Sequence, residues 1–204
     1  ESTRIGMPEI TIALFPDVGG SWFLNKMDGG IGRFLALTSS HINGTDALYC
    51  GLGTHFLAHK QKALVLSKLS ELPWKSEVGV NRDMVHEFLT GLTSDASQPQ
   101  GHLEHNMETI NDWMSGDDLE LISKFVSEWD GEDAWLKKAQ DGFKHGSPLA
   151  AHWIFRQLNQ SREATLREVF ESELILACNI MRHREFAEGV RALLIDKDRS
   201  PIWA

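Results

Sequence analysis

The sequence predicts a short α/β segment over residues 1–59 and a long helical region over residues 60–204. In the first segment, turn signals that contain glycine separate short apolar pieces, whereas apolar residues recur at helical spacing after it. A parallel sheet needs a crossover between paired strands, and so short a segment cannot complete one. We therefore interpret residues 1–59 as the last part of a larger α/β core.

The first segment is expected to hold two strands and three helices. We predict strands over residues 3–7 and 54–58, and helices over residues 20–27 and 31–38 and from about residue 45. The turns between them place glycine beside aspartate, asparagine or a second glycine, which are residues that tolerate turn conformations. This order of short elements is typical of an α/β arrangement with tight connections.

Capping signals mark two helices of the second region. Ser147 before Pro148 is typical of an N-cap with proline in the first turn, and it predicts a helix to about residue 160. Thr165 and Glu168 have the spacing of a capping box, so another helix should begin there. The apolar face of that helix is expected to contain Val169, Phe170, Ala177, Ile180 and Met181.

Three further segments complete the prediction. A short helix is expected over residues 186–194 despite Gly189, and the polar stretch 94–101 is expected to be a surface loop. Helical spacing also relates four apolar residues in the middle of the chain: Ile122, Phe125, Val126 and Trp129. The second region is therefore predicted to be helical apart from the loop over residues 94–101.

The composition is that of a globular protein with a sizeable core, since 42% of its 204 residues are hydrophobic and 24% are charged. The formal net charge is −9 and no cluster of Lys and Arg stands out, which argues against a nucleic-acid partner. No apolar run approaches the roughly 20 residues of a membrane span, and no signal peptide is recognisable. Cys50 and Cys178 are isolated, so we expect a reducing, intracellular compartment and no disulfide.

Histidine pairs and glycine motifs do not form a complete site. His55 and His59 have the i, i+4 spacing of two metal ligands on a helix, but the residues between them look strand-like and no third ligand is evident. His102 and His105 lie beside acidic residues, where a solvated surface is the simpler interpretation. Walker and Gly-x-Ser-x-Gly sequences are absent, so nucleotide hydrolysis and serine-hydrolase chemistry lose support. We expect no metal site.

Glu9 and Asp17 are the leading candidates for chemistry, although each has a structural alternative. Asp17 stands just before Gly19–Gly20 and could cap a helix, and Glu9 could be a surface residue in a turn. Against this, Glu9 lies in an apolar run, where loss of hydration should raise its pKa, whereas a helix N-terminus favours an ionised Asp17. Two carboxylates in such opposed environments suit acid–base or nucleophilic chemistry. Pro16 permits a turn that brings them together.

The stretch MPEITIALFPDVGGSWFL, residues 7–24, resembles the second active-site segment of the crotonase (enoyl-CoA hydratase/isomerase) superfamily. Its Phe-Pro-Asp-Val-Gly-Gly part resembles the 3-hydroxyisobutyryl-CoA hydrolase branch, since typical hydratases have a small residue in place of Asp17. The resemblance spans the chain and is weakest over about residues 71–120. Further segments that carry it are Phe34–Thr38, Asp46–Leu48, Thr54–Phe56, Ser147–Pro148, Arg156–Leu158, Glu185–Ala192 and Pro201–Trp203.

The resemblance implies the C-terminal portion of an α/β crotonase-like spiral fold, predominantly helical in this chain. Residues 1–59 would be the end of the crotonase core with the active-site segment, and residues 60–204 would be a helical C-terminal region. The family's first oxyanion-hole loop and much of its CoA-binding surface belong to an N-terminal half that these residues do not contain. We therefore expect a C-terminal fragment that is inactive by itself.

The activity implied by the resemblance is hydrolysis of a short branched 3-hydroxyacyl-CoA thioester, as in valine catabolism. Glu9 would attack the thioester carbonyl or activate water, and Asp17 would bind the substrate hydroxyl and help to orient Glu9 or the water. CoA is part of the substrate, so neither a cofactor nor a metal is expected.

Two alternatives remain open at this point. One is hydration or isomerisation of an enoyl-CoA, which would use Glu9 but has no clear use for Asp17. The other is a non-catalytic, ribosome-associated relative. The expected partner is an acyl-CoA, with neither nucleic acid nor membrane, and a homo-oligomer is left open. The expected location is the cytoplasm of a bacterium or the mitochondrial matrix of a eukaryote.

Overall fold

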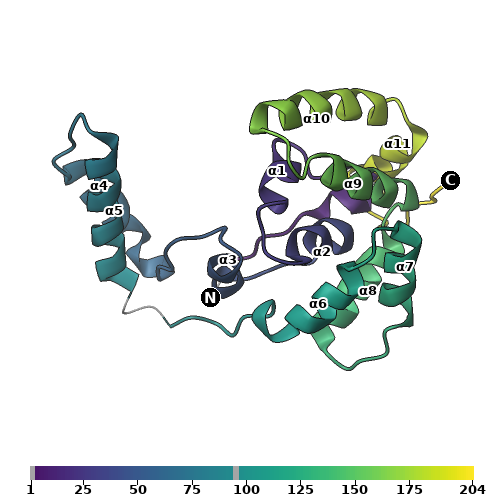
Figure 1. The fold of residues 1–204 in the computed structure, drawn as a ribbon, viewed down its shortest axis with the longest axis horizontal. Coiled ribbons are helices and arrows are strands. Elements are labelled where there is room, and N and C mark those ends of the chain that lie inside the picture. The colour runs from purple at the N-terminus through teal and green to yellow at the C-terminus, as the bar shows by residue number, and fades with distance from the viewer. Residues whose placement is uncertain (1–2, 94–96) are drawn as a thin grey trace. The chain divides into compact units, whose positions relative to one another are not determined.

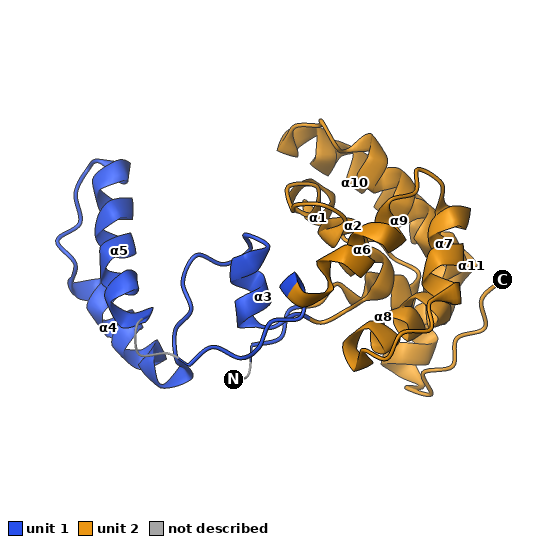
Figure 2. Ribbon diagram, turned by 60° about the horizontal axis from the view of Figure 1, so that its bottom comes forward, with its two compact units in different colours: residues 1–5, 42–104 blue, residues 6–41, 105–204 orange. Residues whose placement is uncertain are grey.

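A computed structural model describes residues 3–93 and 97–204 of the protein (Figure 1). The chain forms two compact units, coloured blue and orange in Figure 2. One unit contains the start of the chain up to residue 5 together with residues 42–104. The other contains residues 6–41 and 105–204, and it holds both predicted catalytic carboxylates.

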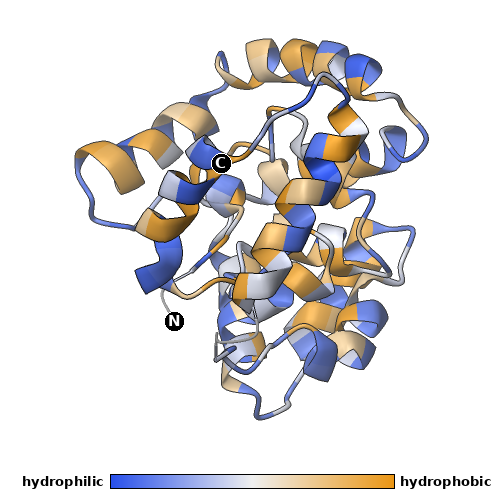
Figure 3. Cartoon of the chain, turned by 90° about the vertical axis from the view of Figure 1, so that its left-hand side faces the viewer, coloured by the Kyte–Doolittle hydropathy of each residue, from blue (hydrophilic) through white to orange (hydrophobic). Residues whose placement is uncertain are grey.

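The larger unit is built from helices. Its elements in chain order are the 3₁₀-helix η1 (Pro8–Ile12), α1 (Gly20–Leu24), α2 (Ile31–Thr38), α6 (Met107–Met114), α7 (Leu119–Glu128), α8 (Ala134–His145), α9 (Pro148–Gln160), α10 (Leu166–Ile180), α11 (Arg184–Val190) and the π-helical turn η4 (Arg191–Ile195). A further 3₁₀ turn, η3 (Glu104–Asn106), precedes α6. In Figure 3 hydrophilic and hydrophobic residues alternate along α10 at the top of the view, as in an amphipathic helix.

Helix α2 forms the centre of the larger unit. Every residue from Ile31 to Thr38 except Arg33 is buried. Helices α1, α6, α8 and α9 and the turn η1 all pack against α2. A helix that is apolar on nearly all sides is stable only inside such a shell, which explains the position of α2.

The turn η1 is held by close backbone contacts from both sides. The amide of Ser147 donates a hydrogen bond to the carbonyl of Ile10 at 3.0 Å. Helix α11 approaches η1 at Gly189, where a Cβ atom would lie 2.5 Å from the carbonyl carbon of Ile12. Glycine is required in α11 for this close approach, which fixes the turn that carries Glu9.

The smaller unit contains α3 (Gly44–Tyr49), η2 (His59–Gln61), α4 (Lys62–Glu71) and α5 (Val78–Thr93). Asn43 and Asp46 form a capping box at the start of α3. The buried carboxylate of Asp46 also accepts hydrogen bonds from the amides of His102 and Leu103, at 2.6 and 2.8 Å. This carboxylate therefore joins two segments of the unit that are far apart in sequence.

Most of the predicted helices are confirmed. Helix α2 has the predicted bounds, and α9 begins after its Ser147 cap and ends at Gln160. The capping box of Thr165 and Glu168 starts α10 as expected. The predicted helix over residues 186–194 is present as α11 followed by η4, and the helix predicted over residues 20–27 is the shorter α1.

The predicted strands are wrong within the described part of the chain. Residues 54–58 form no strand, and residues 3–7 contribute only a single antiparallel bridge between Ile5 and Ile42. A strand needs a partner for its backbone hydrogen bonds, and the described residues provide none beyond that bridge. The expectation of a predominantly helical chain is confirmed. The expected mixture of strands and helices over residues 1–59 is not seen in the described residues.

The predicted boundary between residues 1–59 and 60–204 stays a prediction about the family fold. The two compact units are divided differently, because residues 6–41 pack with the last hundred residues of the chain. The predicted surface loop over residues 94–101 lies partly outside the described residues. Among the helices that the structure describes, none is long and apolar enough to cross a membrane.

Ser147→Ala is expected to destabilise the full-length protein by about 2–3 kcal/mol. The Ser147 side chain is fully buried, caps the Ala150 amide at 3.0 Å and donates to the buried carboxylate of Glu185, which would lose a donor. Denaturant unfolding measures the loss. The control is Thr165→Ala, which removes an exposed cap and should cost less. Equal losses for the two variants would contradict a special role for the buried cap.

Candidate active site

Glu9 is carried by the 3₁₀-helix η1. Pro8 occupies the first position of η1, where a fixed φ angle and a missing amide hydrogen are tolerated. The carbonyl of Glu9 accepts a hydrogen bond from the amide of Leu14 at 2.9 Å, and Ala13 ends the turn in the left-handed conformation at φ 53°. The Glu9 backbone is therefore fixed from its own neighbours as well as from α9 and α11.

The Glu9 carboxyl group lies in a poorly hydrated environment. Its Oε2 atom is buried and has no hydrogen-bond partner in the part of the chain that the structure describes. Burial raises the pKa of Glu9 above its ordinary value, and the charge of Asp17 raises it further, while a hydrogen bond from the residue's own backbone acts in the opposite direction. The rise in pKa predicted from the apolar sequence context is therefore present.

Asp17 stands in the turn between η1 and α1, and its side chain is exposed. The turn contains two consecutive residues with positive φ, Val18 at 55° and Gly19 at 83°, and the Asp17 carbonyl accepts the Gly20 amide at 2.8 Å. The N-cap of α1 is Gly19, with no side-chain cap. The alternative that Asp17 caps this helix through its side chain is thus not supported.

Glu173 of α10 is a further residue of this region, and it was not predicted from the sequence. Its buried carboxylate accepts hydrogen bonds from the amides of Gly19 at 2.7 Å and Ser21 at 3.1 Å. A sequence signal exists in retrospect, because Glu173 lies one helical turn from both Val169 and Ala177 in the predicted apolar face. A charged residue inside an apolar face indicates a buried polar contact.

Asp17 thus lies near enough to Glu9 for its charge to raise the Glu9 pKa, and Glu173 binds the turn that carries Asp17. It does not unite the histidine pairs in a metal site. His55 lies outside the helices and forms a hydrogen bond with the Thr54 hydroxyl, while His59 begins η2. The described residues contain no group of three or more His, Cys, Asp or Glu side chains arranged to hold a metal ion.

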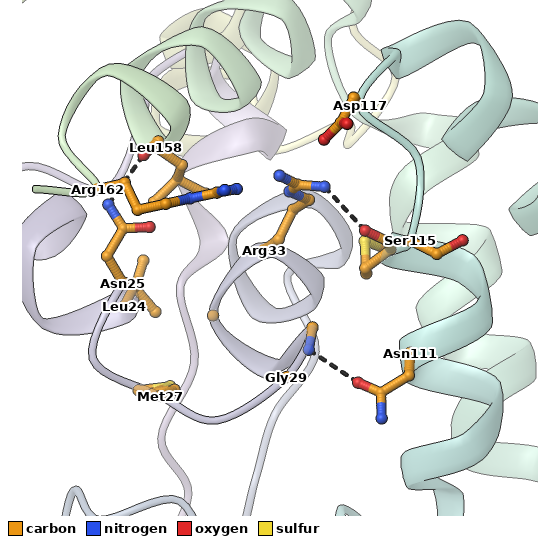
Figure 4. Close-up of a pocket in the computed structure, with 13 residues that line it drawn as sticks. Leu24, Asn25, Met27, Gly29, Arg33, Asn111, Ser115, Asp117, Leu158 and Arg162 are labelled. Atoms are coloured by element: carbon orange, nitrogen blue, oxygen red, sulfur yellow. Dashed lines mark hydrogen bonds between the residues drawn. The ribbon is translucent and has the colours of Figure 1, made fainter.

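A separate polar pocket of about 360 Å³ is lined by none of the predicted site residues (Figure 4). Arg33 of α2 donates to the carbonyl oxygens of Met114 and Gly116 and to Oδ1 of Asn159, each at 2.8 Å. Burial and the nearby charge of Arg162 lower the pKa of Arg33. The Arg33 guanidinium therefore links α2 to the ends of α6 and α9, which is a role in the fold.

Residues 1–204 match a family model described as enoyl-CoA hydratase/isomerase. The chain belongs to this family. The mitochondrial 3-hydroxyisobutyryl-CoA hydrolase of Bos taurus is 36% identical over 203 residues, which cover 100% of this chain and 52% of that protein. The chain therefore spans about half the length of this and similar curated relatives.

One further relative and one solved structure have names that indicate other roles than hydrolysis. The small ribosomal subunit protein mS47 of Neurospora crassa is 32% identical over 209 residues, covering 97% of this chain and 41% of that protein. The crystal structure of an enoyl-CoA hydratase from Rhodobacter sphaeroides superposes with a TM-score of 0.80 at 28% identity, covering 100% of this chain and 55% of that one. The crotonase-type fold predicted from the resemblance is thereby supported, in a mostly helical form.

Glu9→Gln is expected to stabilise the full-length protein at pH 8, and the gain should shrink as the pH falls toward 4.5. A raised carboxyl pKa means that the folded state binds the proton more tightly than the unfolded state, so ionised Glu9 costs stability above its folded pKa. Thermal unfolding across this pH range measures the effect. The exposed Glu163→Gln is the control and should show no such trend. A gain that is independent of pH would refute this account of Glu9.

Proposed function

We propose that the full-length protein hydrolyses the thioester bond of a short, branched 3-hydroxyacyl-CoA, with 3-hydroxyisobutyryl-CoA of valine catabolism as the substrate. The observation that carries this proposal is the buried, unpartnered Oε2 of Glu9 beside Asp17. The name of the Bos taurus relative supports the choice of substrate. The names of mitochondrial relatives also favour the mitochondrial matrix in a eukaryotic source, with the cytoplasm as the bacterial equivalent.

Glu9 acts as the catalytic carboxylate in the proposed reaction. In one route, a Glu9 oxygen forms a bond to the thioester carbonyl carbon, the C–S bond breaks, and water then hydrolyses the resulting anhydride. In the other route, Glu9 removes a proton from the water that attacks the same carbon. A carboxylate that has lost hydration is more basic and more nucleophilic, so the raised pKa of Glu9 suits both routes.

Asp17 binds the hydroxyl group of the substrate and thereby selects a 3-hydroxyacyl chain. Its side chain is exposed, so it is accessible to an incoming ligand. Backbone amides outside these 204 residues would hold the thioester oxygen as negative charge develops on it. CoA leaves as a thiolate, which needs no strong acid, and the reaction requires neither a metal nor a cofactor.

Hydration or isomerisation of an enoyl-CoA is the second candidate, because the Rhodobacter sphaeroides neighbour is named as a hydratase. Such a reaction would use Glu9 but would leave Asp17 without a role. The two candidates are separated by measuring free thiol release against loss of the enoyl absorbance. A non-catalytic role is the third candidate, since one relative is named as a ribosomal subunit protein. Recovery of ribosomal particles in a pull-down would favour it.

Glu9→Gln in the full-length protein is expected to lower kcat for thiol release by about 10²–10⁴-fold, because the amide is neither a base nor a nucleophile. KM should change little, since the amide has nearly the same shape. A thiol-trapping assay with 3-hydroxyisobutyryl-CoA measures both constants, with Glu163→Gln as the control that keeps activity. Near-normal turnover by Glu9→Gln would exclude the proposed role of Glu9.

Asp17→Gly is expected to lower kcat/KM for hydrolysis by about 10-fold or more while CoA binding changes less. The variant removes the carboxylate that contacts the acyl hydroxyl, and glycine tolerates any backbone conformation of the turn. Hydrolysis kinetics and calorimetric titration with CoA provide the two measurements. Equal losses in hydrolysis and in CoA binding would indicate that Asp17 has only a structural role.

A further inference from the structure

The turn that carries Asp17 is tied to α10 through a single carboxylate. The two Glu173 oxygens bind different amides: Oε2 accepts from Gly19 at 2.7 Å, and Oε1 accepts from Ser21 at 3.1 Å. The Glu173 side chain is buried, with 3% of the residue exposed. In the part of the chain that the structure describes, no Lys or Arg pairs with it, so the two backbone amides are its main compensation.

The backbone of this turn requires an external restraint. Val18 has φ 55°, which is a strained conformation for a β-branched residue. The Val18 side chain is 77% exposed, so its own packing cannot hold the strained backbone in place. Hydrogen bonds to the neighbouring residues must hold it instead. One of these joins Glu173 to the amide of Gly19, the residue after Val18.

Side-chain packing from α10 reinforces the same contact. A Cβ atom at Gly19 would lie 3.3 Å from Cδ1 of Leu166 and 3.5 Å from the ring of Phe170. Helix α10 thus packs two apolar side chains close to Gly19 and holds the backbone of the turn with Glu173. The capping box at Thr165 fixes where α10 begins and therefore where all three side chains stand.

The hydrogen bonds of Glu173 cap helix α1 and at the same time restrain the turn that carries Asp17. Helix α1 is only five residues long, and Ser21 is its second residue. The shorter of the two hydrogen bonds goes to Gly19, which is the N-cap of α1 and also the last residue of the turn that carries Asp17. The shorter hydrogen bond of the Glu173 carboxylate is therefore formed at Gly19, two residues after Asp17.

We propose that Glu173 is a positioning residue, whose carboxylate holds the amides of Gly19 and Ser21 and so keeps the Asp17 side chain close to Glu9. The inference rests on the proposed function in assigning a catalytic use to Asp17. Glu173 itself touches neither substrate nor reacting atoms and acts only through the turn. Gln in its place has one acceptor oxygen, and its NH₂ group would face the second amide donor, so Glu173→Gln releases one of the two amides.

A double-mutant cycle in the full-length protein tests the proposal. Glu173→Gln is combined with Asp17→Asn, and kcat/KM is measured for whichever CoA thioester reaction the wild type performs. The conservative variant Glu173→Asp retains two acceptor oxygens and replaces the Gln variant in the cycle if the latter does not fold. The matched control is Asp46→Asn, because Asp46 is also a buried carboxylate that binds backbone amides, in the other compact unit.

Glu173→Gln is expected to lower kcat/KM by about 10-fold in the wild-type background and by less than about 3-fold in the Asp17→Asn background. Glu173→Asp should lose less than Glu173→Gln. Asp46→Asn should change kcat/KM by the same factor in both backgrounds, since any effect it has is on stability alone. Equal factors for Glu173→Gln in both backgrounds would overturn the proposal.

A second readout does not depend on the proposed function. Carboxyl ¹³C NMR gives the pKa of Glu9, which the Asp17 charge raises in the wild type. Glu173→Gln should lower this pKa by letting Asp17 move away, and should have no further effect once Asp17→Asn is present. If the protein turns over no CoA thioester, the proposed function fails while this shift still supports positioning. An unchanged Glu9 pKa in Glu173→Gln would overturn the positioning role.

Discussion

Burial of the Glu9 carboxyl group without a partner for Oε2 is the constraint on which the rest of the site depends. A carboxylate in water keeps its hydration shell, and removing that shell costs free energy unless hydrogen bonds or an opposite charge replace it. Among the residues that the structure describes, neither is supplied for Oε2. The fold supplies backbone contacts to η1 from Ser147 and Gly189, which hold the group where it is. Rigid support for an unfavourable environment is typical of a catalytic site.

The second carboxylate is held differently, because Asp17 is exposed on a turn whose backbone is strained. Burial is the main cause of the raised Glu9 pKa, and the charge of Asp17 adds to it, so the separation of the two carboxyl groups contributes to how basic Glu9 is. In the positioning role that we propose for Glu173, α10 maintains that separation through the two amides that Glu173 binds. The site therefore combines a short N-terminal segment with a helix more than 150 residues later in the chain, and all of these parts lie in one compact unit.

Elements with local signals could be predicted from the sequence. The helices at residues 31–38 and 148–160 follow from an apolar run and from a Ser-Pro cap, which act through neighbouring residues. The strand predicted at residues 54–58 failed because an extended segment becomes a strand only beside a partner. Glu173 was missed because its contact with Gly19 joins residues 154 positions apart, and no local pattern identifies such a partner. Glu9 and Asp17 could be predicted as candidates because both lie in one short segment of the sequence, and their catalytic roles stay a prediction.

The central claim is that Glu9 works as a base or nucleophile whose pKa the fold has raised. The most direct measurement is the pH dependence of kcat/KM for hydrolysis of 3-hydroxyisobutyryl-CoA by the full-length protein, because its acidic limb reports the essential base of the free enzyme. The account predicts a midpoint above the ordinary glutamate value of 4.5, because burial favours the protonated form. A midpoint at or below 4.5 would contradict it.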